Sequence, residues 1–126
     1  MTAFTRDGTP VAMEGGGLDF RKREAGGGMS VAFIHLPAGT DMAPALKGLE
    51  GDLCQCPHWG YVFKGRIRMR TATGEEVYEA GQAYYWGPGH APEALEDVDV
   101  VEFSPTAEFD AVIDHVKAQA QAQAQT

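Results

Sequence analysis

Residues 61–73, YVFKGRIRMRTAT, show the alternation of a β-strand over most of their length. Ile67 and Met69 alternate with arginines, and on a strand successive side chains point to opposite faces of the sheet. The two apolar side chains are therefore expected inside the protein and the arginines outside. Gly65 interrupts the run, so the stretch is predicted to form either one long strand with a kink or the two strands of a hairpin.

Further short strands lie on both sides of this stretch and are separated by turn residues. Strands are predicted over residues 29–36, 75–80, 81–86 and 99–103. The 16 glycines and 7 prolines of the chain favour many short strands joined by turns over a helical protein. Strands at this spacing are typical of a β-sandwich or β-barrel, and the fold class is therefore predicted to be all-β.

At the C-terminus the period changes from that of a strand to that of a helix. Apolar residues recur there at i, i+3, i+4 and i+7, which predicts one α-helix over residues 106–118, packed against the outside of the barrel. The stripe consists of Phe109, Val112, Ile113 and Val116. Residues 119–126 alternate glutamine and alanine and are predicted to be frayed or disordered, and the glycine-rich residues 1–28 are interpreted as an N-terminal arm.

The length of 126 residues predicts a single domain that spans the whole chain. A hydrophobic content of 44% excludes a disordered protein, and no apolar run approaches the roughly 20 residues of a membrane helix. The first residues lack the apolar core of a secretory signal, so a cytoplasmic location is expected. In that reducing compartment the two cysteines are not expected to form a disulfide.

The net charge of the chain argues against some classes of binding partner. The 10 basic and 18 acidic side chains leave a net charge of −8, which argues against binding to nucleic acid or to anionic membranes. One local exception is a basic ladder of period two. The ladder consists of Lys64, Arg66, Arg68 and Arg70. It is interpreted as the solvated face of a strand, or else as a docking strip for an acidic partner or for the acidic surface of a second subunit.

The residues best suited to carry chemistry lie in one short segment and one later turn. Cys54, Cys56 and His58 occupy alternate positions, and His90 follows a Gly-Pro-Gly turn. If the segment is extended, the two thiols and the imidazole point to one face of the sheet. Two thiolates and two imidazoles suit a tetrahedral zinc ion, with iron or copper as alternatives. Binding by all four residues predicts a closed structural site, and binding by three leaves a position open for water or substrate.

Two other interpretations of these residues compete with a metal site. Buried free cysteines often pack simply as small apolar residues. Alternatively, His58 or His90 could lower the pKa of a neighbouring thiol and so produce a redox-active or nucleophilic thiolate.

Aromatic and acidic residues near these candidates complete the predicted site. Tyr85 and Trp86 lead into the Gly-Pro-Gly turn and are expected to line a ligand pocket at the mouth of the barrel. Among the carboxylates only Asp52 is expected on the face of the ligands. Glu102 is interpreted as solvated, although its alternation with Val101 and Phe103 leaves its face open. An acid–base group beside the ligands would favour an enzyme over a binding module.

The sequence resembles the small single-domain cupins, in residues 29–104. Gly65 matches the closing glycine of the family's first motif, and Gly81 to Gly89 match the frame of the second. This resemblance implies a jelly-roll-like β-barrel that binds a metal inside and forms a homodimer. The ligand positions depart from the family's usual set of three histidines and one carboxylate. Asp52 and Cys54 stand at two usual histidines, His58 at the usual glutamate, and Pro92 at the last histidine.

The predicted function is that of a metal-binding cupin that binds or transforms a small molecule in the barrel. Its metal ligands are expected to be Cys54, Cys56, His58 and His90, with a divalent ion, zinc first, as cofactor. The alternative is a non-catalytic module that holds a small ligand or a structural zinc ion.

Overall fold

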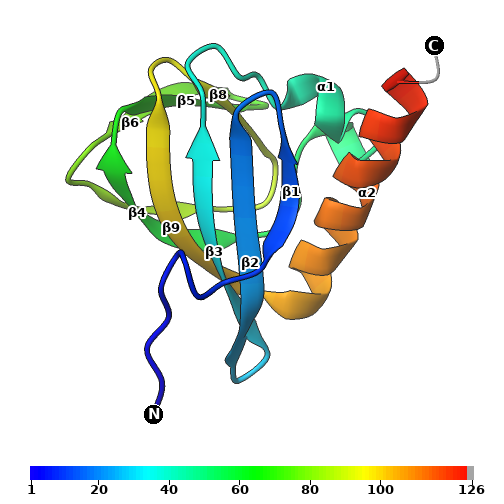
Figure 1. The fold of residues 1–126 in the computed structure, drawn as a ribbon. Coiled ribbons are helices and arrows are strands. Elements are labelled where there is room, and N and C mark those ends of the chain that lie inside the picture. The colour runs from blue at the N-terminus through cyan, green and yellow to red at the C-terminus, as the bar shows by residue number, and fades with distance from the viewer. Residues whose placement is uncertain (125–126) are drawn as a thin grey trace.

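The computed structural model describes residues 1–124 and consists mostly of β-strands, with one long helix at the C-terminus (Figure 1). The strands are β1 (Val11–Gly15), β2 (Leu18–Gly26), β3 (Met29–Leu36), β4 (His58–Lys64), β5 (Arg66–Thr71), β6 (Gly74–Glu79), β7 (Ala83–Trp86), β8 (His90–Ala94) and β9 (Val98–Pro105). The helices are α1 (Ala43–Leu46), the 3-10 turn η1 (Glu50–Asp52) and α2 (Thr106–Ala124). The predicted all-β class with a C-terminal helix is confirmed.

The strands form two antiparallel sheets. The larger sheet has the order β1-β2-β3-β9-β4-β7, and the smaller has the order β6-β5-β8. Ile67 and Met69 on β5 are buried in a core that both sheets share, as the alternation predicted. β3 also has the predicted bounds.

Gly65 is the point where the chain passes from one sheet to the other. β4 pairs with β7 and β9, whereas β5 pairs with β6 and β8, so residues 61–73 form neither one strand nor a hairpin. The φ angle of Gly65 is +85°, in the left-handed region that favours glycine. A Cβ atom at this position would overlap the carbonyl oxygen of Asp97, so the close approach also requires glycine.

The arginines of the basic ladder are paired within the protein, whereas Lys64 ends β4 in the larger sheet and is separate from them. Arg68 contacts Glu93 on β8 at 3.1 Å and Glu75 on β6 at 3.5 Å. Arg70 contacts Asp41 at 2.7 Å. Arg66, Arg68 and Arg70 alternate along β5 with the buried Ile67 and Met69, which agrees for these three residues with the interpretation of a solvated strand face.

The two ends of the chain are more ordered than the sequence indicated. The predicted glycine-rich arm contains β1 and β2, which pair with each other and extend the larger sheet beyond β3. The C-terminal helix continues to Ala124 instead of ending near residue 118. Gln119 donates a hydrogen bond to the carbonyl oxygen of Lys47 at 2.9 Å, which holds the added turns against the chain. Residues 125–126 of the predicted tail lie outside the described part.

The apolar stripe of α2 closes the space between the sheets instead of lying on the outside of a barrel. Phe109, Ile113 and Val116 are buried and belong to the same core as the strands. Figure 1 shows α2 running along one side of the sheets, next to α1. Along the described chain, no helix has the length and apolarity needed to cross a membrane.

Candidate metal centre

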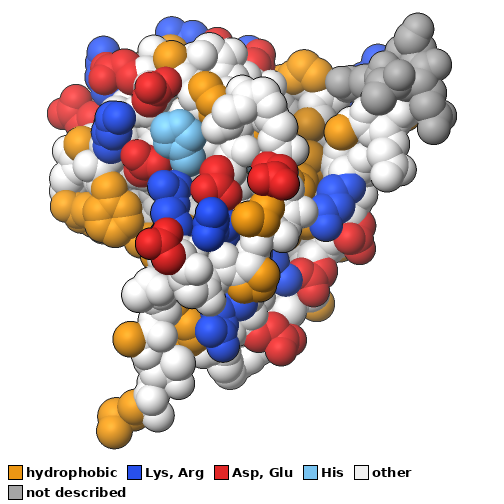
Figure 2. Space-filling view, in the orientation of Figure 1, with side chains coloured by type: hydrophobic (Ala, Val, Ile, Leu, Met, Phe, Trp, Pro, Cys, Tyr) orange, Lys and Arg blue, Asp and Glu red, His pale blue; other side chains and the backbone are white. Residues whose placement is uncertain are grey.

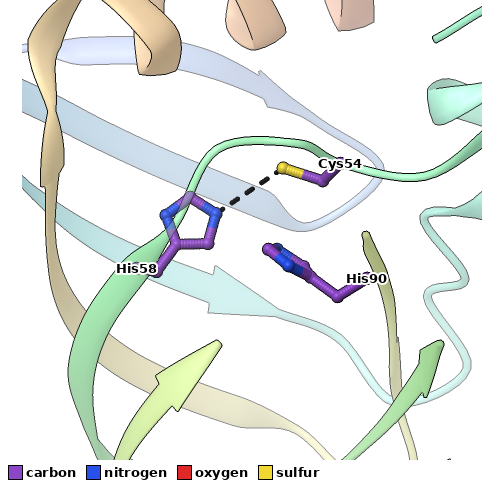
Figure 3. A group of neighbouring side chains, drawn as sticks. All are labelled: Cys54, His58 and His90. Carbon is purple, nitrogen blue, oxygen red and sulfur yellow. Dashed lines mark hydrogen bonds between the residues drawn. The ribbon is translucent and has the colours of Figure 1, made fainter. Parts of the chain in front are cut away.

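Three of the four predicted ligands converge between the two sheets (Figure 3). His58 begins β4 in the larger sheet, His90 begins β8 in the smaller sheet, and Cys54 lies in the segment before β4. The backbone joins these positions, because the amide of Cys54 donates to the carbonyl oxygen of His90 at 2.8 Å. One donor atom from each side chain lies within 4.8 Å of the other two, and all three residues are buried.

The separation of sulfur and nitrogen fits a shared metal ion. Cys54 Sγ lies 3.7 Å from His58 Nε2. For a tetrahedral zinc ion with bonds of about 2.3 Å to sulfur and 2.0–2.1 Å to nitrogen, the two ligand atoms lie about 3.6 Å apart. The observed distance therefore needs almost no adjustment to hold such an ion.

The hydrogen bond of His90 determines which of its nitrogens can bind a metal. Nδ1 lies 2.6 Å from the carbonyl oxygen of Gly87. A carbonyl oxygen only accepts, so Nδ1 carries the proton and Nε2 keeps its lone pair. Burial lowers the pKa of His90 to about 4, and the imidazole is therefore neutral at pH 7.

His58 is oriented in the same way from β9. Its Nδ1 lies 2.6 Å from Ser104 Oγ and 3.2 Å from Glu102 Oε2. Burial lowers the pKa of His58 to about 4, so the ring is neutral at pH 7 and its contact with Glu102 is not an ion pair. Because Nδ1 takes part in the hydrogen bond with Ser104, Nε2 remains on the side of Cys54.

Glu102 was expected in solvent, and this prediction is wrong. The side chain is 3% exposed, and Tyr84 donates its hydroxyl to Glu102 Oε1 at 2.7 Å. Burial raises the pKa of Glu102 to about 7. On β9 the inward positions are Val98, Val100, Glu102 and Ser104, but Val101 and Phe103 on the other face are apolar too. The alternation that could have placed Glu102 inside was therefore ambiguous.

Comparison with known proteins identifies the architecture. No family model and no curated protein matches the sequence, but solved structures match the fold. An RmlC-like cupin from Shewanella frigidimarina NCIMB 400 is similar with a TM-score of 0.58 at 16% identity, over 81% of this chain and 88% of that chain. The chain has a cupin fold.

Two structures of named enzymes are similar to the same degree. Ectoine synthase from P. lautus gives a TM-score of 0.60 at 14% identity, over 84% of this chain and 78% of that chain. A variant of oxalate decarboxylase from B. subtilis gives 0.59 at 15% identity, over 81% of this chain but only 28% of that chain. These likenesses establish the cupin fold, and the chemistry has to be argued from the residues of this chain.

Within the cupin fold, Cys56 and Asp52 stay apart from the converging ligands. Cys56 is buried, but its sulfur contacts the carbonyl oxygen of Pro57 at 3.5 Å and does not belong to the group of three. The segment before β4 is not a regular strand, so equal burial of alternate residues does not aim their sulfurs at one point. Asp52 is exposed and accepts from the amide of Gly48 at 2.9 Å.

Both thiols are protonated at neutral pH in the absence of a metal. Burial raises the pKa of Cys54 and of Cys56 to about 12. This contradicts the interpretation in which a histidine lowers a thiol pKa and produces a reactive thiolate. A metal ion that binds Cys54 must displace its proton, so binding weakens as the pH falls.

A cavity of about 90 Å³ extends from Cys54, His58 and His90 into the cupin fold. Its walls come from both sheets and from the stripe of α2. Trp86 lines this cavity, and Tyr84 stacks on the Trp86 ring with ring centroids 3.5 Å apart. Tyr85 faces the other way, is exposed, and packs on Trp59. Of the two predicted pocket residues, Trp86 therefore contacts the space next to the ligands, and Tyr85 borders only a groove outside it.

Proposed function

We propose that the protein holds one zinc ion through Cys54, His58 and His90, and that the fourth position of the ion opens into the cavity. The observation that carries this proposal is the convergence of three buried donor atoms from separate parts of the fold. Cys54 supplies sulfur, and each imidazole presents Nε2 because its Nδ1 is occupied by another oxygen. Sulfur and imidazole donors are the set that zinc prefers.

An open position distinguishes this proposal from a structural zinc site. Structural sites close the ion with four protein ligands, whereas sites that act on small molecules keep three. Cys56 is the residue that could close the site, and it lies outside the group of three. The geometry therefore favours a cupin that binds or transforms a small molecule over a cupin in which zinc only stabilises the fold.

The residues around the proposed ion favour the binding of a small molecule at its open position. A zinc ion bound there supplies a Lewis acid and lowers the pKa of a bound water. Glu102 and Ser104 hold the His58 ring in one orientation, and Gly87 does the same for His90. Most of the walls of the cavity are apolar. A thiol ligand also needs a reducing environment, which supports our proposal of a cytoplasmic location.

Metal analysis of protein purified without a metal-affinity tag tests the proposal. We expect about one zinc ion per chain after equilibration with zinc and dialysis, because two of the three ligands are already neutral and oriented. The same sample, analysed for copper and iron, shows whether another ion takes the place of zinc. A metal content below about a tenth per chain would contradict the proposal and leave the cysteines as packing residues.

We also propose that two copies associate through an aromatic surface on the larger sheet. This surface consists of Trp59, Tyr61, Phe63, Tyr85 and Phe103. The five side chains are between 39% and 58% exposed, and in the sheet register Trp59 lies opposite both Tyr85 and Phe103. Figure 2 shows hydrophobic side chains exposed over the region of β4.

Area and charge favour a second copy as the partner. Five half-exposed aromatic rings offer on the order of 500 Å², a large share of the roughly 800 Å² that each partner buries in a stable interface. Two copies, each with a net charge of −8, can approach only where acidic groups are few or paired. Asp99 borders the surface and is paired with both Arg6 and His35.

A Phe63→Glu variant is expected to convert the dimer to a monomer, because it places a charge at the most exposed side chain of a face that must become dry. Light scattering after size-exclusion chromatography measures the mass. Val77→Glu is the matched control, since Val77 is 43% exposed on β6, outside the aromatic surface. A wild-type monomer at high micromolar concentration, or dissociation of both variants, would rule out this interface.

A further inference from the structure

The cavity beside the metal centre is polar at one end and apolar along the rest of its wall. The polar side chains that line it are Cys54, His58, His90 and Glu102. Three of these are the proposed zinc ligands, and Glu102 contacts His58 at 3.2 Å. The other lining residues are aliphatic, aromatic, methionine or proline, and within residues 1–124 no lysine or arginine lines the cavity. A molecule in this cavity therefore meets polar side chains beside the metal centre and apolar side chains elsewhere.

The helix α2 carries the apolar wall away from the metal centre. The stripe begins with Phe109, whose ring centroid lies 5.3 Å from that of His58. Val112, Ile113 and Val116 follow on the same helix and line the same cavity. With a rise of about 1.5 Å per residue, Val116 lies about 10 Å from Phe109 along the helix axis. The apolar wall therefore begins next to the proposed ion and continues for about two turns of α2.

The volume and the wall together limit the part of a molecule that lies along α2. The cavity measures about 90 Å³, whereas a cavity of about 150 Å³ accommodates benzene with its six carbons. By this comparison the cavity accepts roughly four carbons. Hydroxyl groups along the chain would lie against the apolar wall without partners, which opposes the binding of polyols. A short alkyl chain fits these limits.

The proposed ion gives the other end of the cavity a preference for one anionic group. Zinc binds cysteine as a thiolate and histidine as a neutral imidazole, so an ion with Cys54, His58 and His90 keeps one net positive charge. Glu102 approaches His58 at Nδ1, whereas Nε2 is the nitrogen on the side of Cys54. The other carboxylate oxygen of Glu102 accepts the hydroxyl of Tyr84 at 2.7 Å. The open position of the ion is therefore left to a group that the ligand supplies.

We infer that the cavity takes a short, unbranched monocarboxylate of about four carbons, whose carboxylate binds the zinc ion and whose alkyl chain lies along the stripe of α2. The inference rests on the proposed function, because it names the class of molecule for the same site. A carboxylate carries the same charge as a hydroxide at the open position, so it can take the place of that hydroxide without changing the charge of the site.

Titration of the zinc-loaded protein with acetate, butyrate and octanoate tests the inference, with the methyl signals of α2 followed by nuclear magnetic resonance. Butyrate is expected to bind about 15-fold more tightly than acetate, because each of its two additional methylenes contributes about fourfold when buried. Octanoate should bind more weakly than butyrate, since its chain exceeds the volume. Butan-1-ol has the chain of butyrate without the anionic group and should also bind more weakly. Equal affinities for acetate and butyrate, or for butan-1-ol and butyrate, would overturn the inference.

Substitutions at Val112 test where the alkyl chain lies. Val112 is half-buried, lines the cavity and is not a proposed ligand. Val112→Phe is expected to weaken butyrate binding about tenfold, with acetate binding and zinc content unchanged, because only the longer chain reaches the filled space. Ala111→Phe is the matched control, since Ala111 is exposed on the same helix and does not line the cavity.

The smaller variant Val112→Ala keeps this test decisive if the phenylalanine variant does not fold. It enlarges the cavity, so octanoate should bind nearly as tightly as butyrate. An unchanged preference for butyrate over octanoate in Val112→Ala would contradict the placement of the chain along α2.

Xenon separates this inference from the zinc proposal. Xenon enters apolar cavities without a metal, so it should shift the methyl signals of α2 in the metal-free protein as well. Zinc-loaded protein that binds xenon but not butyrate would refute the ligand class and leave the zinc centre intact. Protein that takes up no zinc would refute both, and metal analysis before the titrations identifies that case.

Discussion

A Cys54→Ser variant is expected to bind zinc at least about 100-fold more weakly than the wild type. Loss of a group that only orients a ligand typically costs 10–100-fold in metal affinity, so loss of the thiolate itself should cost more. Serine keeps the size of the side chain but offers a neutral hydroxyl, which zinc seldom takes as a ligand. Competition with a chromogenic chelator measures the affinity, and thermal unfolding of the metal-free variant checks that it folds.

Cys56→Ser is the matched control for this experiment. Both cysteines are buried, and burial raises the pKa of each to about 12, so the two substitutions remove chemically similar thiols. The cysteines differ in that only Cys54 lies with His58 and His90. The affinity of Cys56→Ser is therefore expected to stay within about threefold of the wild type. A comparable loss in both variants would mean that Cys56 closes the site and that the zinc is structural.

Gly65→Ala is expected to lower the free energy of unfolding by about 4 kcal/mol. Two effects add at this position. An alanine with a φ of +85° adopts the left-handed conformation, which costs about 1–2 kcal/mol. Its Cβ would also overlap the carbonyl oxygen of Asp97 and lie 3.1 Å from Val98 Cγ2, and overpacking of this kind typically costs about 1–3 kcal/mol. Chemical denaturation measures the change.

Gly81→Ala separates the two effects. Gly81 has nearly the same conformation, with a φ of +93°, but a Cβ there meets nothing within 4 Å. We expect this variant to lose only about 1.5 kcal/mol, from the backbone conformation alone. If both variants lost the same stability, the close packing of Gly65 against Asp97 would have no energetic role.

The position of Gly65 also connects the fold to the metal centre. It joins β4, which begins with His58, to β5, which pairs with β8 and so places His90. A shift of the chain at Gly65 would move the two imidazoles relative to each other. Residual folded Gly65→Ala protein should accordingly bind zinc more weakly, which the same chelator competition detects.

The local patterns that the sequence carries predicted the elements of the fold well. Alternation in residues 66–70 placed Ile67 and Met69 in the core, and β3 was predicted with its observed bounds. The apolar stripe in residues 106–118 predicted a helix. Such patterns are reliable because the side-chain period of a strand or helix is a property of the backbone itself. The donor types also selected Cys54, His58 and His90 as ligand candidates before any geometry was known.

Relations between segments far apart in the chain were decided only by the tertiary structure. β4 and β5 are consecutive but belong to different sheets, and α2 closes the interior because its stripe faces a gap between those sheets. Glu102 became the partner of His58 because β9 pairs with β4 in a register that places it inward, although both faces of β9 are apolar. Cys56 is buried but does not belong to the group of Cys54, His58 and His90. Its position along the chain makes it buried, whereas membership of the group depends on the direction in which its sulfur points. The alternation within one segment predicts which face of its strand a residue occupies. Whether two side chains from different strands contact each other depends on how those strands pair in the sheet.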